Sequence, residues 1–319
     1  RASADGRRRF VEDAILFGGL VATLSGCASL PCRSRSTPPQ PLTPDLATYY
    51  QYERQPLAAN LESTKPGSGF EIRQLTLSIP GKPDFRPIRI DWYKPTPSSL
   101  PSPPHGEKAR LRGKQLPAVL MSPILAGDDL YVREFARFYA ARGLHAVLVY
   151  RPKEIFSADR DLKDIETHFR ESVINLRQTI DWLETQDSVD PQRIGSFAIS
   201  LGAILTTILS AVEPRLRCSV LGLPAGQIPE IIMASKDKAI RKRRRAYMEK
   251  HGWTEEQALQ QLKTVMISEP TRLAPSIDPK RTLVIIGLFD RVLGLGRSLD
   301  LWRAMGRPKL VLLPTGHYT

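Results

Sequence analysis

The chain has 319 residues, of which 41% are hydrophobic and 25% are charged, as in an ordinary globular protein. This composition excludes wholesale disorder, a coiled coil and a polytopic membrane protein, and the length allows one large α/β domain or two smaller ones. The 46 Lys and Arg residues outnumber the 33 Asp and Glu residues and give a net charge of +13, which raises nucleic acid or an anionic membrane as a partner. Three cysteines without paired spacing predict neither a disulfide scaffold nor a metal site, and no cofactor is expected.

The first 26 residues have the pattern of an export signal. Three arginines precede an uncharged stretch, Ala14–Leu24, which is too short to span a bilayer as a helix. The stretch ends in Leu-Ser-Gly-Cys27, which resembles the lipobox of bacterial lipoproteins. That resemblance implies removal of residues 1–26, lipidation of Cys27 and a location in the bacterial cell envelope, lipid-anchored and facing the periplasm or the exterior. The alternative is a short apolar helix with an incidental cysteine.

Residues 27–69 are interpreted as a tether and N-terminal extension, because residues 31–44 are rich in proline and polar residues. From residue 70 onward, short apolar runs alternate with helical patterns. The expected strands are Phe70–Ile79, Pro87–Tyr93, Pro117–Met121, His145–Tyr150, Ile194–Ile199, Cys218–Leu223, Leu283–Gly287 and Leu310–Leu313. The expected helices are Leu130–Arg142, Ile165–Thr185, Leu201–Val212 and Ser298–Met305. This alternation predicts one α/β domain over residues 70–319, with a mostly parallel, eight-stranded sheet flanked by helices.

The most informative segment is the turn between the strand that ends at Ile199 and the helix that begins at Leu201. Ser200 lies at this turn, with the small residues Ala198 and Gly202 two positions to either side. A serine on a sharp strand-to-helix turn needs small neighbours, because the flanking backbones pass closely. The pattern alone is weak, and the strand-turn-helix context makes Ser200 a candidate nucleophile.

A serine hydroxyl needs an adjacent base, which in turn needs a group that orients it. His317 follows the last apolar strand, and Asp290 follows the strand before it. Both residues therefore lie at carboxyl ends of strands, where α/β sheets gather their sites. The other four histidines, His105, His145, His168 and His251, are expected to be solvent-facing or structural.

These residues give the chain a resemblance to the α/β-hydrolase superfamily over roughly residues 70–319. The elements that match are AISLGA around Ser200, GLFDRV around Asp290 and PTGH at His317, in the superfamily's order of serine, acid and histidine. Ala198 departs from the commoner glycine. The resemblance implies Ser200 as nucleophile, His317 as general base and then acid, and Asp290 as the group that orients the imidazole.

An oxyanion hole needs two backbone N–H donors aimed at the position where negative charge develops. Leu201, directly after the nucleophile, is expected to supply one. The loop after the third predicted strand, residues 122–129, is expected to supply the other, at Ile124 by alignment with the superfamily, with Leu125 as the alternative. Asp128 and Asp129 in this loop are interpreted as N-cap residues of the next helix.

Residues from about 225 to 280 lie where members of the superfamily often insert a helical cap over the site. Within them, Lys236–Lys250 has eight basic and two acidic residues, a net charge of +6. Either this segment is a solvated helical face, or it contacts anionic lipid headgroups near a lipidated Cys27. A nucleic-acid partner is not expected, because stacking aromatic residues do not interleave the cluster.

The leading interpretation is a serine hydrolase that cleaves an ester or thioester of a small molecule through an acyl-enzyme. A peptidase on the same fold and a catalytically silent binding scaffold at the envelope are the alternatives, although the complete set of three residues disfavours a scaffold. The chain begins with Arg1 and ends two residues after His317, so we expect a longer natural protein at both ends.

Overall fold

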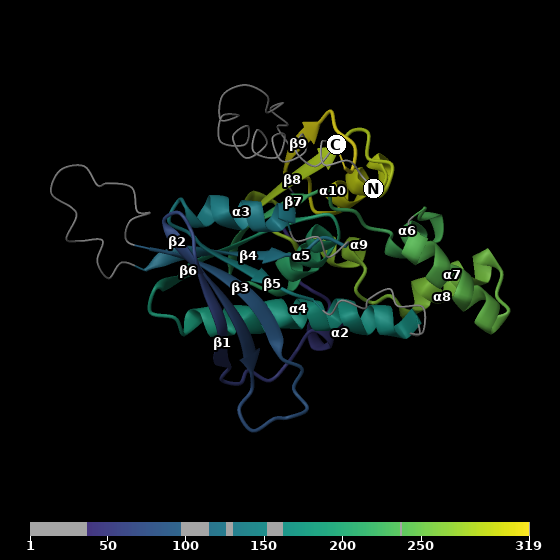
Figure 1. Cartoon of the computed structure of the whole chain (residues 1–319). Coiled ribbons are helices and arrows are strands. Elements are labelled where there is room, and N and C mark those ends of the chain that lie inside the picture. Colours follow the sequence, from purple (N-terminus) through teal and green to yellow (C-terminus); the bar gives the residue numbers. More distant parts are fainter. Residues whose placement is uncertain (1–36, 97–114, 126–129, 152–161, 237, 319) are drawn as a thin grey trace, which may run out of the picture.

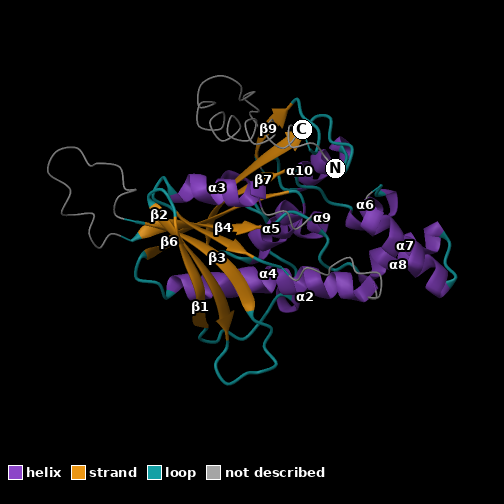
Figure 2. Cartoon of the chain, in the orientation of Figure 1, coloured by secondary structure: helices purple, strands orange, loops and turns teal. Residues whose placement is uncertain are grey.

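The computed structural model describes residues 37–96, 115–125, 130–151, 162–236 and 238–318. The export signal, Cys27, His105 and the Asp128–Asp129 pair therefore lie outside the described residues. A central sheet of nine strands runs through the molecule in the order β1-β2-β3-β5-β4-β6-β7-β8-β9 (Figures 1 and 2). Its strands are β1 (Ala58–Pro66), β2 (Phe70–Ser78), β3 (Ile88–Pro95), β4 (Leu116–Ser122), β5 (His145–Val149), β6 (Val189–Ile199), β7 (Leu216–Gly222), β8 (Thr282–Gly287) and β9 (Lys309–Leu313).

The sheet is antiparallel at one edge and parallel elsewhere. The pairs β1–β2, β2–β3 and β3–β5 are antiparallel, whereas β5–β4, β4–β6, β6–β7, β7–β8 and β8–β9 are parallel. The inner parallel strands β4, β5 and β8 are buried on both faces over most of their length, which is why they occur in the sequence as uninterrupted apolar runs. The edge strand β9 is more exposed. The mostly parallel α/β sheet predicted from the sequence is confirmed.

The ninth strand, β1, was not predicted. It pairs with β2 at the edge of the sheet, with one register shift between Leu61 and Ser63, and nearly all of its residues are exposed on both faces. Without a buried face it has no alternation of apolar and polar residues, so the periodicity that identifies strands is absent from it. The sheet therefore begins at residue 58, within the segment interpreted as an N-terminal extension.

Helices cover both faces of the sheet. On one face lies α3 (Leu130–Ala140), and on the other lie α4 (Leu162–Glu184), α5 (Leu201–Val212) and α10 (Leu295–Ala304); Figure 1 shows α3 and α4 on opposite sides. These four helices are the ones predicted. Residues of α4, α5 and the sheet form the largest buried cluster, which also contains Leu46 and Tyr50 of the short helix α2 (Pro44–Tyr49) and its C-cap.

Between β7 and β8 the chain forms a helical insertion that projects from one end of the molecule (Figure 1). The projecting part contains α6 (Ile228–Ala234), α7 (Lys238–His251) and α8 (Glu255–Val265). The chain then returns to the body as α9 (Pro270–Leu273), which packs against α5, and as the 3₁₀ turns η2 (Ala274–Ser276) and η3 (Pro279–Arg281). The insertion lies where the cap was expected. Among the described residues, the helices are all too short or too polar to cross a membrane.

Candidate active site

Ser200 occupies a strained turn between β6 and α5. Its backbone has φ 56° and ψ −126°, a region that residues with a Cβ atom rarely adopt. The turn is held by a hydrogen bond from the Ser200 N–H to the carbonyl of Gly222, at 2.9 Å. A Cβ atom at Gly202 would lie 2.6 Å from the carbonyl oxygen of Ser122, so only glycine lets α5 approach the end of β4 this closely.

The structure brings Ser200, His317 and Asp290 together, although His317 is 117 residues from Ser200 along the chain. Ser200 Oγ is 2.9 Å from His317 Nε2, and His317 Nδ1 is 2.8 Å from Asp290 Oδ2. When Nδ1 carries the proton that it donates to Asp290, Nε2 is left as the acceptor for the serine hydroxyl. The side chains of His317 and Asp290 are 6% and 1% exposed, so water does not compete for this hydrogen bond.

The environment keeps the Asp290 carboxylate ionised. Burial raises its pKa, but the hydrogen bond and charge of His317, together with the N–H groups of Leu293 and Val292, outweigh burial and hold the pKa below its usual value. Those two N–H groups donate to Oδ1 at 3.0 and 2.8 Å, which leaves Oδ2 for the imidazole. The carboxylate is therefore both charged and fixed in orientation.

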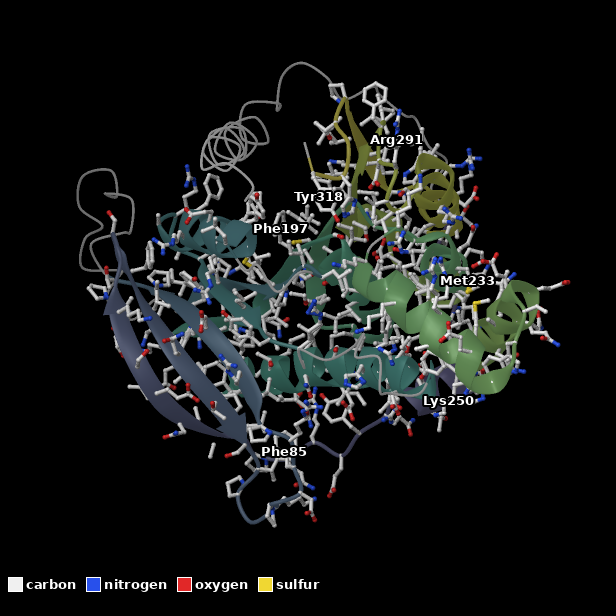
Figure 3. The ribbon with its side chains drawn as sticks, turned by 45° about the vertical axis from the view of Figure 1, so that its right-hand side comes forward. Phe85, Phe197, Met233, Lys250, Arg291 and Tyr318 are labelled. Carbon is white, nitrogen blue, oxygen red and sulfur yellow. The ribbon has the colours of Figure 1, made fainter. Side chains whose placement is uncertain are left out.

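The loops that carry Asp290 and His317 are joined through their backbones. The N–H of Leu288 donates to the carbonyl of Leu313 at 2.9 Å, and the N–H of Phe289 donates to the carbonyl of Thr315 at 3.0 Å. Phe289 and Tyr318, next to the acid and the histidine, are 65% and 69% exposed. Figure 3 shows Tyr318 and Arg291 at the same end of the molecule.

The expected oxyanion donors lie on the two segments that approach each other at Gly202, namely the start of α5 and the loop after β4. Leu201 is the first residue of α5, and residues 122–125 continue from β4. Ile124 and Leu125 are half-buried, and their carbonyl oxygens accept hydrogen bonds from Arg151 Nη2 at 2.6 and 2.8 Å. Arg151 was not singled out from the sequence, although its place directly after the strand at His145 is the kind of position where site residues gather.

The three other histidines that the structure describes are placed away from Ser200. His145 is buried against Trp92, whose Nε1 donates to His145 Nδ1 at 3.2 Å, and burial lowers its pKa to about 4. His168 is buried in α4 beside the carbonyl of Asp164. His251, at the end of α7, stacks on Trp253 with ring centroids 4.2 Å apart.

The basic segment of the cap divides into two faces. Lys238, Arg241, Lys242 and Arg245 are exposed at helical spacing on α7. Arg243, in contrast, is only 2% exposed and packs against the Tyr247 ring. Arg244 donates to the carbonyls of Ile232 and Met233 in α6 and to Ser235. The segment is thus a solvated face in part, and Arg244 joins α7 to α6.

A carboxylate that the sequence did not single out joins the two ends of the cap. Glu269 Oε1 accepts from the N–H of Gln227 at 2.7 Å, and Oε2 accepts from the N–H of Ile228 at 2.8 Å. Oε1 also accepts from Thr271. Because the partners at residues 227 and 228 are backbone groups, composition and spacing gave no signal for this link.

In the described part of the chain, the His, Cys, Asp and Glu side chains form no group of three or more that could hold a metal ion.

Comparison with known proteins relates the chain to esterase structures and to uncharacterized sequences. No protein-family model matches it. Over 170 residues it is 24% identical to two uncharacterized proteins of Mycobacterium tuberculosis, a match that covers 52% of this chain but only 38% of theirs. Acetyl xylan esterase 1 from a Thermoanaerobacterium species is 17% identical, with a TM-score of 0.57 over 91% of this chain and 94% of that one.

Two further solved structures have the same architecture. An acetyl xylan esterase from a Paenibacillus species is 16% identical, with a TM-score of 0.60 over 86% of this chain and 87% of that one. The glucuronoyl esterase from Solibacter usitatus is 12% identical, with a TM-score of 0.51 over 86% of this chain and 87% of that one. Together with the strand order, these similarities show that the chain has the α/β-hydrolase fold; at these identities they describe the fold alone.

Proposed function

We propose that this protein is a serine hydrolase that cleaves an ester through an acyl-enzyme. The observation that carries the proposal is the chain of hydrogen bonds from Ser200 Oγ to His317 Nε2 and from His317 Nδ1 to Asp290 Oδ2. In it, a nucleophile lies within reach of a base whose tautomer is set by a buried carboxylate. The strained backbone of Ser200 and the half-buried position of its side chain present the hydroxyl to a substrate.

The first half of the reaction forms the acyl-enzyme. Ser200 Oγ attacks the ester carbonyl while His317 Nε2 takes the hydroxyl proton, and Asp290 stabilises the imidazolium that results. The carbonyl oxygen becomes an oxyanion, which the N–H of Leu201 and a second N–H from Ile124 or Leu125 stabilise. The tetrahedral intermediate then collapses, His317 gives its proton to the leaving alcohol, and the acyl group stays on Ser200.

The second half of the reaction uses the same groups with water as the nucleophile. His317 Nε2 takes a proton from water, the hydroxide adds to the acyl carbonyl, and the serine leaves with the proton returned by His317. Thioesters follow the same path with a thiol as leaving group. Since the acetyl xylan esterases share this fold, acetyl esters of small alcohols and sugars are the first substrates to test.

Fluorophosphonate labelling and hydrolysis of p-nitrophenyl acetate test the proposal together. The folded wild-type protein should be labelled and active, and Ser200→Ala should lose both properties. The matched control is Ser210→Ala, a serine in the helix that Ser200 precedes, whose hydroxyl bonds Thr206 and Ser219 instead. Absence of labelling in the folded wild type, or equal labelling of Ser200→Ala, would overturn the assignment.

The same experiment, extended to an amide substrate, separates the two alternatives. A scaffold that binds without chemistry would not react with the probe. A peptidase would be labelled, and would cleave an amide substrate at a kcat/KM comparable with that for the corresponding ester. The proposed esterase should prefer the ester by a wide margin.

We also propose that the protein is held at the bacterial envelope by a lipid on Cys27, with the exposed basic face of α7 against anionic headgroups. The order of charge, apolar run, small residues and cysteine supports the anchor. Four exposed cations at helical spacing, Lys238, Arg241, Lys242 and Arg245, support the contact, since basic residues near an anionic membrane each contribute about 1 kcal/mol.

The two parts of this proposal have separate tests. Cys27→Ala should abolish acylation and move the protein out of the membrane fraction; unchanged acylation and fractionation would refute the anchor.

Vesicle sedimentation tests the contact of α7 with the membrane. Without the lipid, the protein should sediment with anionic but not neutral vesicles at low salt. Replacing the four α7 cations by Gln should remove this binding, while replacing Lys65, Lys82, Lys280 and Lys309, exposed elsewhere, should leave it intact. Equal effects of both quadruple variants would contradict a specific α7 contact.

A further inference from the structure

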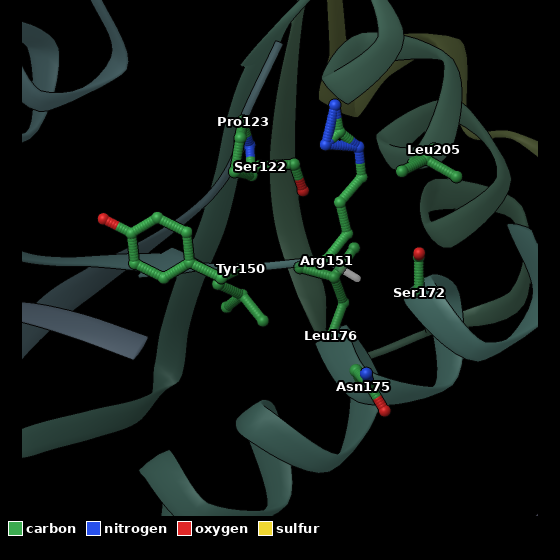
Figure 4. Close-up of a pocket in the computed structure, with 9 residues that line it drawn as sticks. Ser122, Pro123, Tyr150, Arg151, Ser172, Asn175, Leu176 and Leu205 are labelled. Carbon is green, nitrogen blue, oxygen red and sulfur yellow. The ribbon is translucent and has the colours of Figure 1, made fainter. Parts of the chain in front are cut away.

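Arg151 reaches the loop that is expected to carry one of the oxyanion donors. The residue lies two positions after the end of β5, and its side chain enters a pocket formed by the end of β4, by α4 and by α5 (Figure 4). The lining includes Ser122, Pro123, Ser172 and Leu205. Both hydrogen bonds come from one nitrogen, Nη2, which bonds the carbonyl oxygens of Ile124 and Leu125 at 2.6 and 2.8 Å.

Binding these carbonyls fixes the direction of neighbouring N–H groups. The carbonyl of Ile124 and the N–H of Leu125 belong to one planar trans peptide, so they point in opposite directions. Arg151 therefore turns the Leu125 N–H to the side of the loop that faces away from the guanidinium. Holding the Ile124 carbonyl also restricts rotation of the backbone at Ile124, whose own N–H is the other candidate donor.

The same contact changes the strength of the donor. Arginine remains charged throughout the accessible pH range, and it lies in a pocket lined by protein rather than in open solvent. A positive charge on the carbonyl oxygen polarises the peptide and makes its N–H a better donor, because linked hydrogen bonds strengthen one another. Such a donor acts mainly on the transition state, where the substrate oxygen carries negative charge.

The chain that leads to Arg151 is itself fixed. The N–H of Tyr150 donates to the carbonyl of Arg89 at 2.9 Å. The Tyr150 hydroxyl donates to Asp91 Oδ2 at 2.9 Å and accepts from Arg133 Nη2 at 2.8 Å. Asp91 is buried at 4% exposure. Arg151 thus starts from a rigid point of the sheet, and its guanidinium can impose a position on the loop.

We propose that Arg151 is a positioning residue of the oxyanion hole, which orients the backbone of residues 124–125 through their carbonyl groups and polarises the N–H of Leu125 through the carbonyl of Ile124. This inference rests on the proposed serine hydrolase and adds to it a residue that acts through the backbone without touching the substrate. It predicts that loss of the guanidinium affects the transition state more than the binding of substrate.

Steady-state kinetics on p-nitrophenyl acetate test this proposal with Arg151→Ala. The kcat should fall at least about 10-fold and at most about 1000-fold, the upper end of the loss expected when an oxyanion donor is removed outright, while KM changes less than about threefold. Guanidinium chloride added at non-denaturing concentrations should restore part of the activity of Arg151→Ala and none of that of Ser200→Ala. The matched control is Arg244→Ala, which removes a guanidinium that also bonds backbone carbonyls, but in the cap; its kcat should stay close to wild type.

Two further measurements keep the outcomes distinct. Hydrogen exchange of the peptide containing residues 122–125 should be faster in Arg151→Ala than in wild type and Arg244→Ala, whether or not the enzyme acts on the chosen ester. If Arg151→Ala does not fold, Arg151→Lys replaces it and should show a smaller fall in kcat at unchanged KM. Unchanged kcat, a loss confined to KM, or unchanged exchange would overturn the role of Arg151 in a protein that fluorophosphonate still labels. Absence of labelling in wild type would instead overturn the proposed hydrolase.

Discussion

A Cβ atom built on Gly287 would lie 2.8 Å from the carbonyl oxygen of Thr315. Gly287 ends β8, three residues before Asp290, and Thr315 lies two residues before His317. The loop with the acid and the loop with the histidine are therefore in contact through bare backbone, and the distance between Asp290 and His317 depends on the absence of a side chain at position 287.

Gly287→Ala is expected to lower kcat/KM by about 10- to 100-fold, because displacement of a catalytic group by around 1 Å has effects of this size. The added methyl group must push the Thr315 carbonyl away and carry His317 with it. The control is Gly296→Ala in α10, where a Cβ atom would meet nothing within 4 Å. Kinetics of both variants, with thermal unfolding measured in parallel, check the prediction; equal activities would contradict it.

Asp290→Asn is expected to reduce kcat by about four orders of magnitude while leaving the fold intact. An amide in place of the carboxylate can donate to His317 Nδ1, so the imidazole is held in the tautomer whose Nε2 carries a proton and cannot accept the proton of Ser200. Asp300→Asn, an exposed carboxylate of α10 paired with Arg303, is the control and should retain full activity. A residual kcat within tenfold of wild type would show that Asp290 does not orient the base.

Glu269→Ala is expected to loosen the cap. The substitution leaves the N–H groups of Gln227 and Ile228 without their acceptor, and unsatisfied buried donors cost about 1–3 kcal/mol. Limited proteolysis should cut within residues 227–270 more rapidly than in wild type, and the free energy of unfolding should fall. Glu256→Ala, on the exposed first turn of α8, should change neither; an equal effect of both variants would exclude a specific role for Glu269.

His145 makes the fold sensitive to mild acid. Burial lowers its pKa from the usual 6.5 of histidine to about 4, so below pH 6.5 the unfolded chain binds a proton that the folded protein does not. Stability from this group is full above pH 6.5 and decreases as the pH falls toward 4, by on the order of 2 kcal/mol at pH 5. Urea unfolding of wild type and His145→Gln at pH 5 and 8 measures it. The difference in free energy of unfolding between the two pH values should be smaller in the variant, and an identical difference would contradict the assignment.

The sequence predicted those parts of the fold that are encoded in buried apolar residues. The helix predicted at Leu201–Val212 is found with the same bounds, because its apolar run is continuous and Ser200 interrupts it sharply. The convergence of Ser200, Asp290 and His317 could be predicted because parallel strands bring their carboxyl ends to one edge of the sheet. The chemical roles of these three residues stay predictions until the variants are measured.

What could not be predicted depends on backbone groups or on charges that face inward. Arg151 bonds backbone carbonyl groups and Glu269 bonds backbone N–H groups. Almost every residue carries both groups, so the sequence contains no particular residue type that would identify the partner of either side chain. Arg243 and Arg244 occur in a run of basic residues, and only helical phase distinguishes them from the exposed Arg241 and Arg245. The strand β1 contains a polar sequence whose order comes from hydrogen bonding to β2 alone.

The polar edge strand β1 also affects whether molecules of this protein associate with one another. A sheet edge with free N–H and C=O groups can pair with the edge of a second molecule and begin aggregation. The outermost strand here carries Glu62 and Lys65 and ends in Pro66, and charge and proline are features that oppose such pairing. With β1 in place, the apolar residues of β2, such as Leu75 and Leu77, lie one strand inside the edge. Removal of residues 58–66 would expose β2 as the new edge and should make the protein prone to self-association at concentrations at which the intact chain stays monodisperse.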